Sequence, residues 1–124
     1  MIDYLSLEDL LTIVERYRLQ AVRDLGLLDS AAHRPRATLF GDDAYPSMEE
    51  KSSVLLESIV RNLPLIDGNK RLGWISAVMF LERNGFRVNA PFDDAYDLVI
   101  AVATGQMTYQ ESAAMLAAWT STST

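Results

Sequence analysis

The chain has 124 residues, of which 49% are hydrophobic and 23% charged, and its formal net charge is −6. This size and balance predict one folded domain, while the lack of cysteine and the single histidine exclude disulfides, thiolate metal sites and most histidine-based ones. The acidic charge disfavours nucleic acid as a direct partner, and without a membrane-spanning apolar run or a secretion signal the protein is expected to be cytoplasmic.

The N-terminal third carries one helical pattern and then changes character. Ser6 and the acidic residues after it predict a helix start, and apolar residues at helical spacing continue the pattern to Leu25. Residues 29–46 contain Pro35, Pro46 and the polar run Gly41-Asp42-Asp43, so we expect a loop there. Within this loop, residues 36–40 are expected to form a short extended piece or a small hairpin arm.

Four further helices are predicted from capping motifs, periodicity and helix-ending residues. The second of these is apolar on nearly all sides, so it is expected to be the central helix. The fold class is all-α, a compact helical bundle in a single domain over residues 1–119, with a disordered tail at 120–124. The predicted helices cover residues 47–62, 69–84, 93–104 and 108–119.

The turn between the helices at 47–62 and 69–84 is the candidate functional site. It ends in two adjacent cations, Lys70 and Arg71, as the second of these helices begins. A helix start presents unpaired N–H groups and the positive end of the helix dipole, so it attracts anions. Two cations placed there oppose the dipole, but together with the N–H groups they favour an anion such as phosphate. Asp67 is suited to a magnesium ion that bridges phosphates. A solvated turn with surface cations explains the same residues equally well.

The run Arg61-Asn-Leu-Pro-Leu-Ile-Asp-Gly-Asn-Lys-Arg71 resembles the signature of the Doc (death-on-curing) toxins, a branch of the Fic fold. The family pattern is His, any residue, an apolar residue, any residue, Asp, Gly or Ala, Asn, Lys, Arg. Residues 4–9, 40–46 and 80–85 resemble the same family, so the likeness runs from residue 4 to about 119. It implies a Fic/Doc-like bundle with a flap or hairpin arm near residues 34–46.

The resemblance implies a toxin of a toxin–antitoxin system. Doc toxins carry a lysine, here Lys70, where AMP-transferring Fic proteins have a second glycine, and this lysine is associated with transfer of the γ-phosphate of ATP. The implied reaction phosphorylates a threonine of elongation factor Tu and stops translation, and a partly disordered antitoxin neutralises the toxin. An AMP-transferring Fic-type enzyme is the alternative. Trp74, where AMP-transferring members have a second arginine, favours the kinase branch, although core packing also explains a tryptophan.

Site roles carry over by position. Asp67 would bind Mg²⁺ or orient the phosphates, and it belongs with Lys70 and Arg71 to the catalytic positions. The flap would align the target by strand-like pairing, whereas the plain alternative for that segment is a mobile surface loop. The implied nucleotide-binding residues are Arg61, Gly68, Asn69, Lys70 and Arg71, and the implied flap residues are Arg36, Ala37, Thr38, Leu39 and Phe40.

One position departs from the pattern, because the catalytic histidine of the family falls on Leu63. The histidine acts as general base, and losing such a base lowers the rate by ~10²–10⁴-fold. We therefore predict a nucleotide pocket with little or no transfer activity, and we expect His33 to be a surface residue, not a replacement base. A His codon becomes a Leu codon by one base change, so two origins stay open: a detoxified toxin, or a natural non-catalytic module that binds a nucleotide or an antitoxin.

Overall fold

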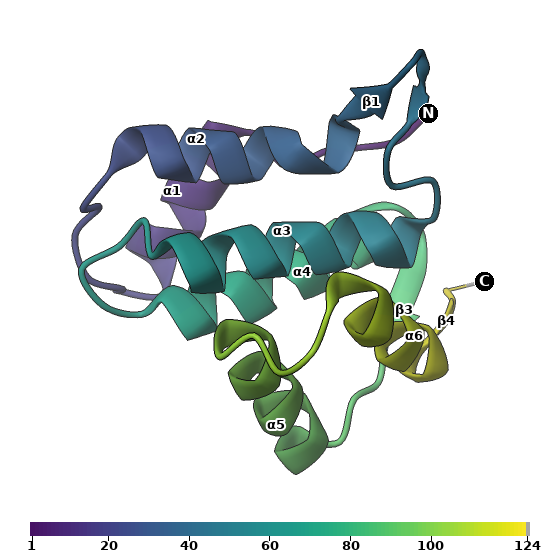
Figure 1. The fold of residues 1–124 in the computed structure, drawn as a ribbon. Helices are drawn as coiled ribbons and strands as arrows, with labels where there is room; N and C mark the ends of the chain where they lie inside the picture. The colour runs from purple at the N-terminus through teal and green to yellow at the C-terminus, as the bar shows by residue number, and fades with distance from the viewer. Residues whose placement is uncertain (124) are drawn as a thin grey trace.

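The structure, a computed structural model, describes residues 1–123. These residues form mainly helices, and two small antiparallel sheets pair β1 with β2 and β3 with β4 (Figure 1). The predicted all-α class is confirmed. The helices are α1 (Leu7–Arg16), α2 (Leu25–His33), the 3-10 turn η1 (Arg34–Arg36), α3 (Met48–Asn62), α4 (Asn69–Arg83), α5 (Phe92–Ala103) and α6 (Tyr109–Trp119), and the strands are β1 (Thr38–Leu39), β2 (Asp42–Asp43), β3 (Phe86–Val88) and β4 (Thr120–Thr122).

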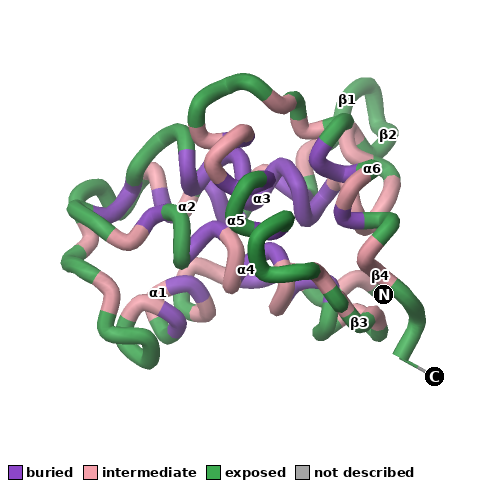
Figure 2. The backbone as a smooth tube through the Cα atoms, turned by 90° about the horizontal axis from the view of Figure 1, so that it is seen from below, coloured by how far each residue is buried: buried purple, intermediate pink, exposed green. Residues whose placement is uncertain are grey.

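The central helix is α3, not the helix at 69–84 that was predicted to be central. Figure 1 shows α3 between α2 and α6, with α4 behind it, and Figure 2 shows buried backbone along α3. Residues 51–60 are all buried. The apolar residues of α4 on its outer side, Trp74 and Ile75 among them, are only partly buried. The prediction failed because the apolar content of a helix does not show which of its faces are covered by neighbouring helices.

Every helix in the described chain is too short or too polar to cross a bilayer.

The first predicted helix is too long: α1 ends at Arg16, residues 17–24 are not helical, and α2 occupies part of the segment expected to be loop. At the end of α1, Arg18 adopts a left-handed conformation with φ +54°, which turns the chain away from the helix axis. Asp24 then caps α2, because its carboxylate accepts a hydrogen bond from the N–H of Leu27 at 3.0 Å. The apolar spacing runs on through Leu25, so periodicity alone extended the predicted helix over residues 17–24.

The C-terminal segment is partly ordered, contrary to the predicted disordered tail. Residues 120–122 form β4, which pairs antiparallel with β3, and Thr120 lies opposite Val88. Ser123 continues the pairing through a backbone hydrogen bond of 3.0 Å to the carbonyl of Gly85. Backbone pairing needs no apolar side chain, and threonine is β-branched, so a low-complexity threonine and serine run suits a strand. Residue 124 lies outside the described residues.

The contact between α3 and α4 leaves no room for a side chain at Gly73. A Cβ atom there would lie 2.8 Å from Val60 Cγ1 and 2.9 Å from Leu56 Cδ1. Gly73→Ala is therefore expected to lower the free energy of unfolding by about 1–2 kcal/mol, since overpacking outweighs the gain in helix propensity. Gly26→Ala is the control: it lies in the exposed first turn of α2, and its Cβ would meet only the exposed side-chain oxygen Asp24 Oδ1, at 3.3 Å, so the free energy of unfolding should change less than for Gly73→Ala. Urea unfolding measures both, and stabilisation by Gly73→Ala would contradict this packing.

Candidate functional site

The loop between α3 and α4 is shaped by two left-handed residues and a proline. Leu63 caps the end of α3 with φ 56° and ψ 59°, and Pro64 follows it, which excludes helical continuation. Gly68 begins α4 with φ 90°, a conformation that favours glycine. The backbone N–H groups of residues 69–71 donate to no group in the described chain. These free N–H groups make the start of α4 an anion-binding end.

Two polar side chains of the motif form hydrogen bonds inside the loop. Asn69 is buried, and its amide donates to the carbonyl of Leu65 at 3.0 Å and accepts from the N–H of Leu65 at 2.9 Å. The side chain of Asn69 therefore shapes the loop, while Asn69 also lines the larger cavity and its role in binding a nucleotide stays a prediction. Asp67 accepts from the N–H of Gly68 at 2.8 Å. Because this carboxylate makes no other hydrogen bond or ion pair within residues 1–123, it keeps an oxygen available.

The segment between α1 and α2 holds the motif loop in place. Arg23 donates through Nε to the carbonyl of Leu63 at 2.8 Å and through Nη2 to the carbonyl of Asn62 at 3.0 Å. An antiparallel bridge joins Val22 to Leu65. The carbonyls at the end of α3 have no helical partner, and Arg23 satisfies two of them. These contacts fix the backbone at position 63.

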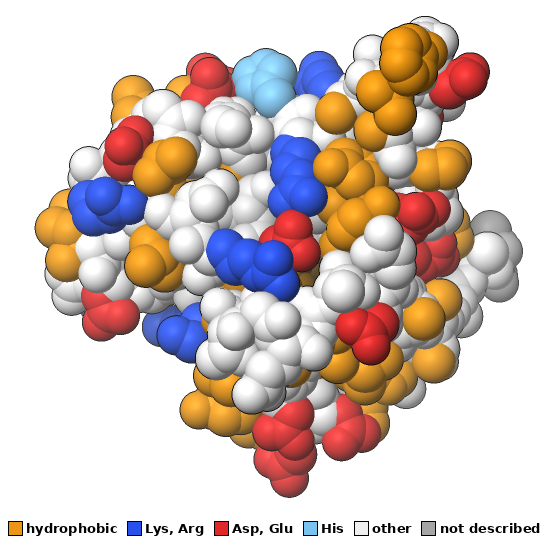
Figure 3. All heavy atoms as spheres, in the orientation of Figure 1, with side chains coloured by type: hydrophobic (Ala, Val, Ile, Leu, Met, Phe, Trp, Pro, Cys, Tyr) orange, Lys and Arg blue, Asp and Glu red, His pale blue; other side chains and the backbone are white. Residues whose placement is uncertain are grey.

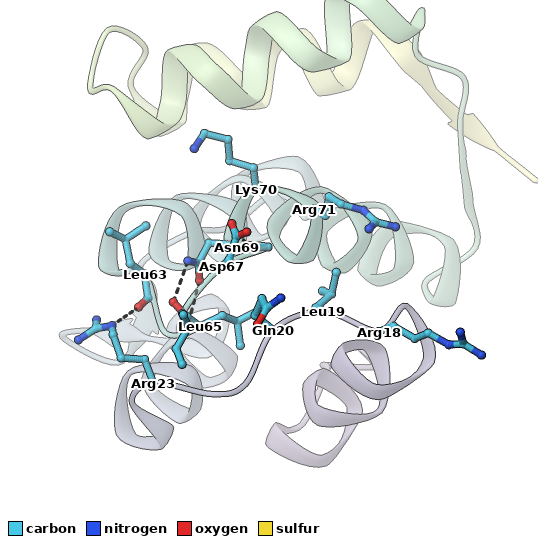
Figure 4. A pocket seen from close by; sticks show the side chains of 12 residues that line it. Arg18, Leu19, Gln20, Arg23, Leu63, Leu65, Asp67, Asn69, Lys70 and Arg71 are labelled. Carbon is cyan, nitrogen blue, oxygen red and sulfur yellow. Dashed lines mark hydrogen bonds between the residues drawn. The ribbon is translucent and has the colours of Figure 1, made fainter.

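Two cavities meet at the first turn of α4. The larger, about 600 Å³, lies between the motif loop and the segment that joins α1 to α2 (Figure 4). The smaller, about 330 Å³, lies between α4 and α5 and is lined by Trp74, Phe92 and Tyr96. Lys70 and Arg71 line both cavities. In Figure 4 the two side chains extend in different directions from α4, so the same two cations border both cavities.

The larger cavity is cationic although the protein is acidic. Arg18, Arg23, Lys70 and Arg71 line it, against the single carboxylate of Asp67. Within the described chain, neither Lys70 nor Arg71 forms an ion pair, and both side chains are exposed. Unpaired cations beside free N–H groups are suited to phosphate, which accepts charge-assisted hydrogen bonds from both.

Arg61 does not line either cavity, contrary to its implied role. Its guanidinium donates to the carbonyls of Val102 at 2.9 Å and Met107 at 3.1 Å, and lies 3.5 Å from the carboxylate of Glu57. These contacts tie α3 to the last turn of α5 and to the loop that follows α5. On the face drawn in Figure 3, cationic and acidic side chains meet near the centre of the molecule. The structure thus gives Arg61 a packing role.

The predicted arm is a hairpin over residues 38–43, where β1 and β2 pair antiparallel. Phe40 and Gly41 form its turn, both with positive φ, +52° and +85°. Phe40 is 98% exposed and Leu39 is 61% exposed. Figure 3 shows hydrophobic atoms projecting at the corner where Figure 1 labels β1. Positive φ at both positions is what a tight two-residue hairpin turn requires, and the first position usually carries Asn, Asp or Gly, so an exposed phenylalanine is unusual there.

The base of the hairpin is fixed to the body of the protein. Lys51 is fully buried on α3, and its Nζ lies 3.1 Å from the carboxylate of Asp43 in β2. The guanidinium of Arg36 lies over the ring of Tyr4, 4.6 Å from its centroid. The carbonyl of Ala37 accepts a backbone hydrogen bond that closes the hairpin. Of the five predicted flap residues, Thr38, Leu39 and Phe40 lie in the hairpin itself, whereas Arg36 and Ala37 belong to its base.

Arg34 connects the segment after α2 to α3. Its guanidinium donates to Glu57 Oε1 at 2.9 Å, Ser58 Oγ at 3.0 Å and Tyr45 Oη at 3.2 Å. Burial opposes its charge, but the hydrogen bonds to Tyr45 and Glu57 outweigh burial and raise the pKa of Arg34. The guanidinium therefore stays charged and holds the hairpin side of the fold against α3.

Residues 4–81 of the chain match the model of the Fic/DOC family, and the chain belongs to this family. It is also similar to the protein named Toxin Doc from Mycolicibacterium smegmatis (strain ATCC 700084 / mc(2)155). The two are 47% identical over 122 residues, which cover 94% of this chain and 93% of that protein. The predicted family and fold are thereby confirmed.

Sequence reasoning missed the part of the cavity that comes from the segment between α1 and α2. Arg18, Gln20 and Arg23 line the cavity from this segment, which was predicted to continue the first helix. The one available signal was Asp24, a favoured N-cap residue just before Leu25. His33 is exposed, as expected, and lines a separate cavity beside α1, away from position 63.

Proposed function

We propose that this chain is a toxin of the Doc type whose site binds ATP with Mg²⁺. With a base at position 63, the same site would transfer the γ-phosphate to a threonine of elongation factor Tu and so stop translation. The observation that carries the proposal is the unpaired pair Lys70 and Arg71 beside the free N–H groups of α4, with Asp67 next to them. The resemblance of residues 61–71 to the Doc signature supports the choice of reaction.

The two cavities suit the two parts of a nucleotide. The cationic cavity is suited to the phosphates, and the apolar cavity lined by Trp74, Phe92 and Tyr96 is suited to a nucleobase, because aromatic rings stack on its planar face. No three His, Asp or Glu side chains converge as a metal-binding group in the described chain. A lone Asp67 still fits Mg²⁺, which proteins usually hold through one or two carboxylates plus substrate phosphates.

The chain as it stands is proposed to bind nucleotide without transferring phosphate. Leu63 lines the phosphate cavity and is 47% exposed, so its side chain occupies the place where the family carries a base. Leucine has no proton acceptor, and the attacking hydroxyl would stay protonated. The same observation supports a second candidate, a natural non-catalytic module that binds a nucleotide or an antitoxin.

The proposed partners fit two further surfaces. The edge of the β1–β2 hairpin offers backbone pairing to an extended target segment, and the exposed Phe40 offers an apolar anchor for it. A cognate antitoxin is proposed to cover the shallow groove lined by Tyr17, Trp74 and Met79. An amphipathic segment that folds onto an apolar groove would bury these partly exposed side chains.

The reaction is tested with Leu63→His protein, elongation factor Tu, Mg²⁺ and ATP labelled at either the α or the γ position. Label is expected on the elongation factor only from the γ position, and on a threonine. Label that arrives only from the α position would reject the kinase in favour of the AMP transferase. No label from either position, although the variant binds ATP, would favour the non-catalytic module.

A further inference from the structure

The end of α1 carries an arginine where this kind of helix end usually carries glycine. After Tyr17, the C-cap, the N–H of Arg18 donates to the carbonyl of Glu15 at 3.2 Å and the N–H of Leu19 to that of Val14 at 2.9 Å. This pair of hydrogen bonds is the Schellman motif, in which the residue at the place of Arg18 is left-handed and most often glycine. Arg18 holds that conformation with φ +54°, so its backbone is strained relative to glycine.

The side chain of Arg18 contributes to the larger cavity. Arg18 lines it together with Arg71 and, within residues 1–123, its guanidinium makes no hydrogen bond and no ion pair. Figure 4 shows Arg18, at the end of α1, and Arg71, on α4, extending toward the same side of the view, with Leu63 on the opposite side. Two unpaired cations from different elements thus lie toward one end of the cavity, and position 63 lies toward the other.

We infer that Arg18 is a specificity-determining residue that binds the polyphosphate of the nucleotide and selects a chain of phosphates over a single phosphate. The inference rests on the proposed function. A nucleotide that places its terminal phosphate beside position 63 has to run its remaining phosphates along the cavity, toward Arg71 and Arg18. One phosphate can be held at the start of α4 alone, whereas a longer anion gains the charge-assisted hydrogen bonds of Arg18.

The variant Arg18→Gly separates this role from a structural one. Glycine adopts the left-handed conformation without strain, so the midpoint of thermal unfolding is expected to rise or stay unchanged. Binding is expected to change the other way: the affinity for MgATP and for inorganic tripolyphosphate falls about tenfold, the effect of one lost charge-assisted hydrogen bond. The affinity for inorganic phosphate, followed by NMR, changes less than about twofold. A residue that only ends α1 would not give these opposite changes.

Two matched variants complete the test. Arg18→Lys keeps the charge and is expected to retain most of the affinity for MgATP, and Arg16→Ala removes an exposed cation of α1 that does not line the cavity and leaves the affinity unchanged. The inference would be overturned if Arg18→Gly bound tripolyphosphate as tightly as the parent chain does, or if it lost affinity equally for tripolyphosphate and for phosphate. The proposed function would still stand after either result if the double variant Lys70→Ala with Arg71→Ala bound MgATP more weakly than the parent chain. A parent chain that binds neither MgATP nor tripolyphosphate would overturn both.

Discussion

Leu63→His is expected to raise the rate of phosphate transfer by ~10²–10⁴-fold and to stop the growth of cells that express the variant without antitoxin. The backbone and the cavity at position 63 already suit a histidine. Arg23 fixes the backbone at position 63 through the carbonyls of Asn62 and Leu63, and the side chain at that position already faces the phosphate cavity. Histidine is also enriched among left-handed residues, so it should fold at φ 56° at least as well as leucine.

The matched control for this substitution is Leu63→Asn. Asparagine tolerates the left-handed conformation as well as histidine does, and it is polar, but it cannot accept a proton at neutral pH. The asparagine variant should therefore fold, bind MgATP and leave growth unaffected. Growth on induction and transfer of label measure both variants. If the histidine variant binds MgATP yet neither transfers phosphate nor slows growth, position 63 is not the site of a missing base.

The double substitution Lys70→Ala with Arg71→Ala is expected to weaken MgATP binding by about 100-fold or more. Each lost charge-assisted hydrogen bond to phosphate contributes about 1.5–3 kcal/mol, and 1.4 kcal/mol is a factor of ten. Stability should change in the opposite direction, because two cations no longer oppose the dipole at the start of α4, which is a gain of ~0.3–1 kcal/mol for each cation. Isothermal titration and urea unfolding measure the two effects.

The control for this variant is Arg16→Ala with Arg87→Ala, which changes the net charge by the same amount at exposed positions outside both cavities. It should bind MgATP as the parent chain does. The MgATP affinity of the parent chain should also fall as salt rises, since a cationic cavity is screened. Equal affinities for the two double variants would mean that overall charge, not the pair at the start of α4, attracts the nucleotide.

Local sequence signals accounted for much of the fold. The capping boxes at Ser47 and Thr108 predicted the starts of α3 and α6 correctly, because such caps depend on residues within one helical turn. Pro64 correctly ended α3 for the same local reason. The boundary between α1 and α2 depended instead on a single left-handed arginine, and arginine carries no sequence signal for that conformation.

The candidate site was predictable only where its residues are contiguous in the chain. Asp67, Lys70 and Arg71 lie together because a tight turn and a helix start place them there. Arg61 is separated from them because carbonyls far along the chain, in the last turn of α5 and in the loop after it, bind its guanidinium. Arg18 reaches the cavity only through tertiary packing of the segment after α1. Long-range contacts of this kind leave no periodicity or spacing in the sequence.

The most direct test of the nucleotide site is a titration of ¹⁵N-labelled protein with MgATP, followed through the backbone amide signals. The free N–H groups of residues 69–71 should bind phosphate, so the signals of Gly68, Asn69, Lys70 and Arg71 are expected to shift and to saturate. Amide signals of α6, on another side of α3, should stay in place. Signals from Gly68 to Arg71 that do not move at any MgATP concentration reached would contradict a phosphate site at the start of α4.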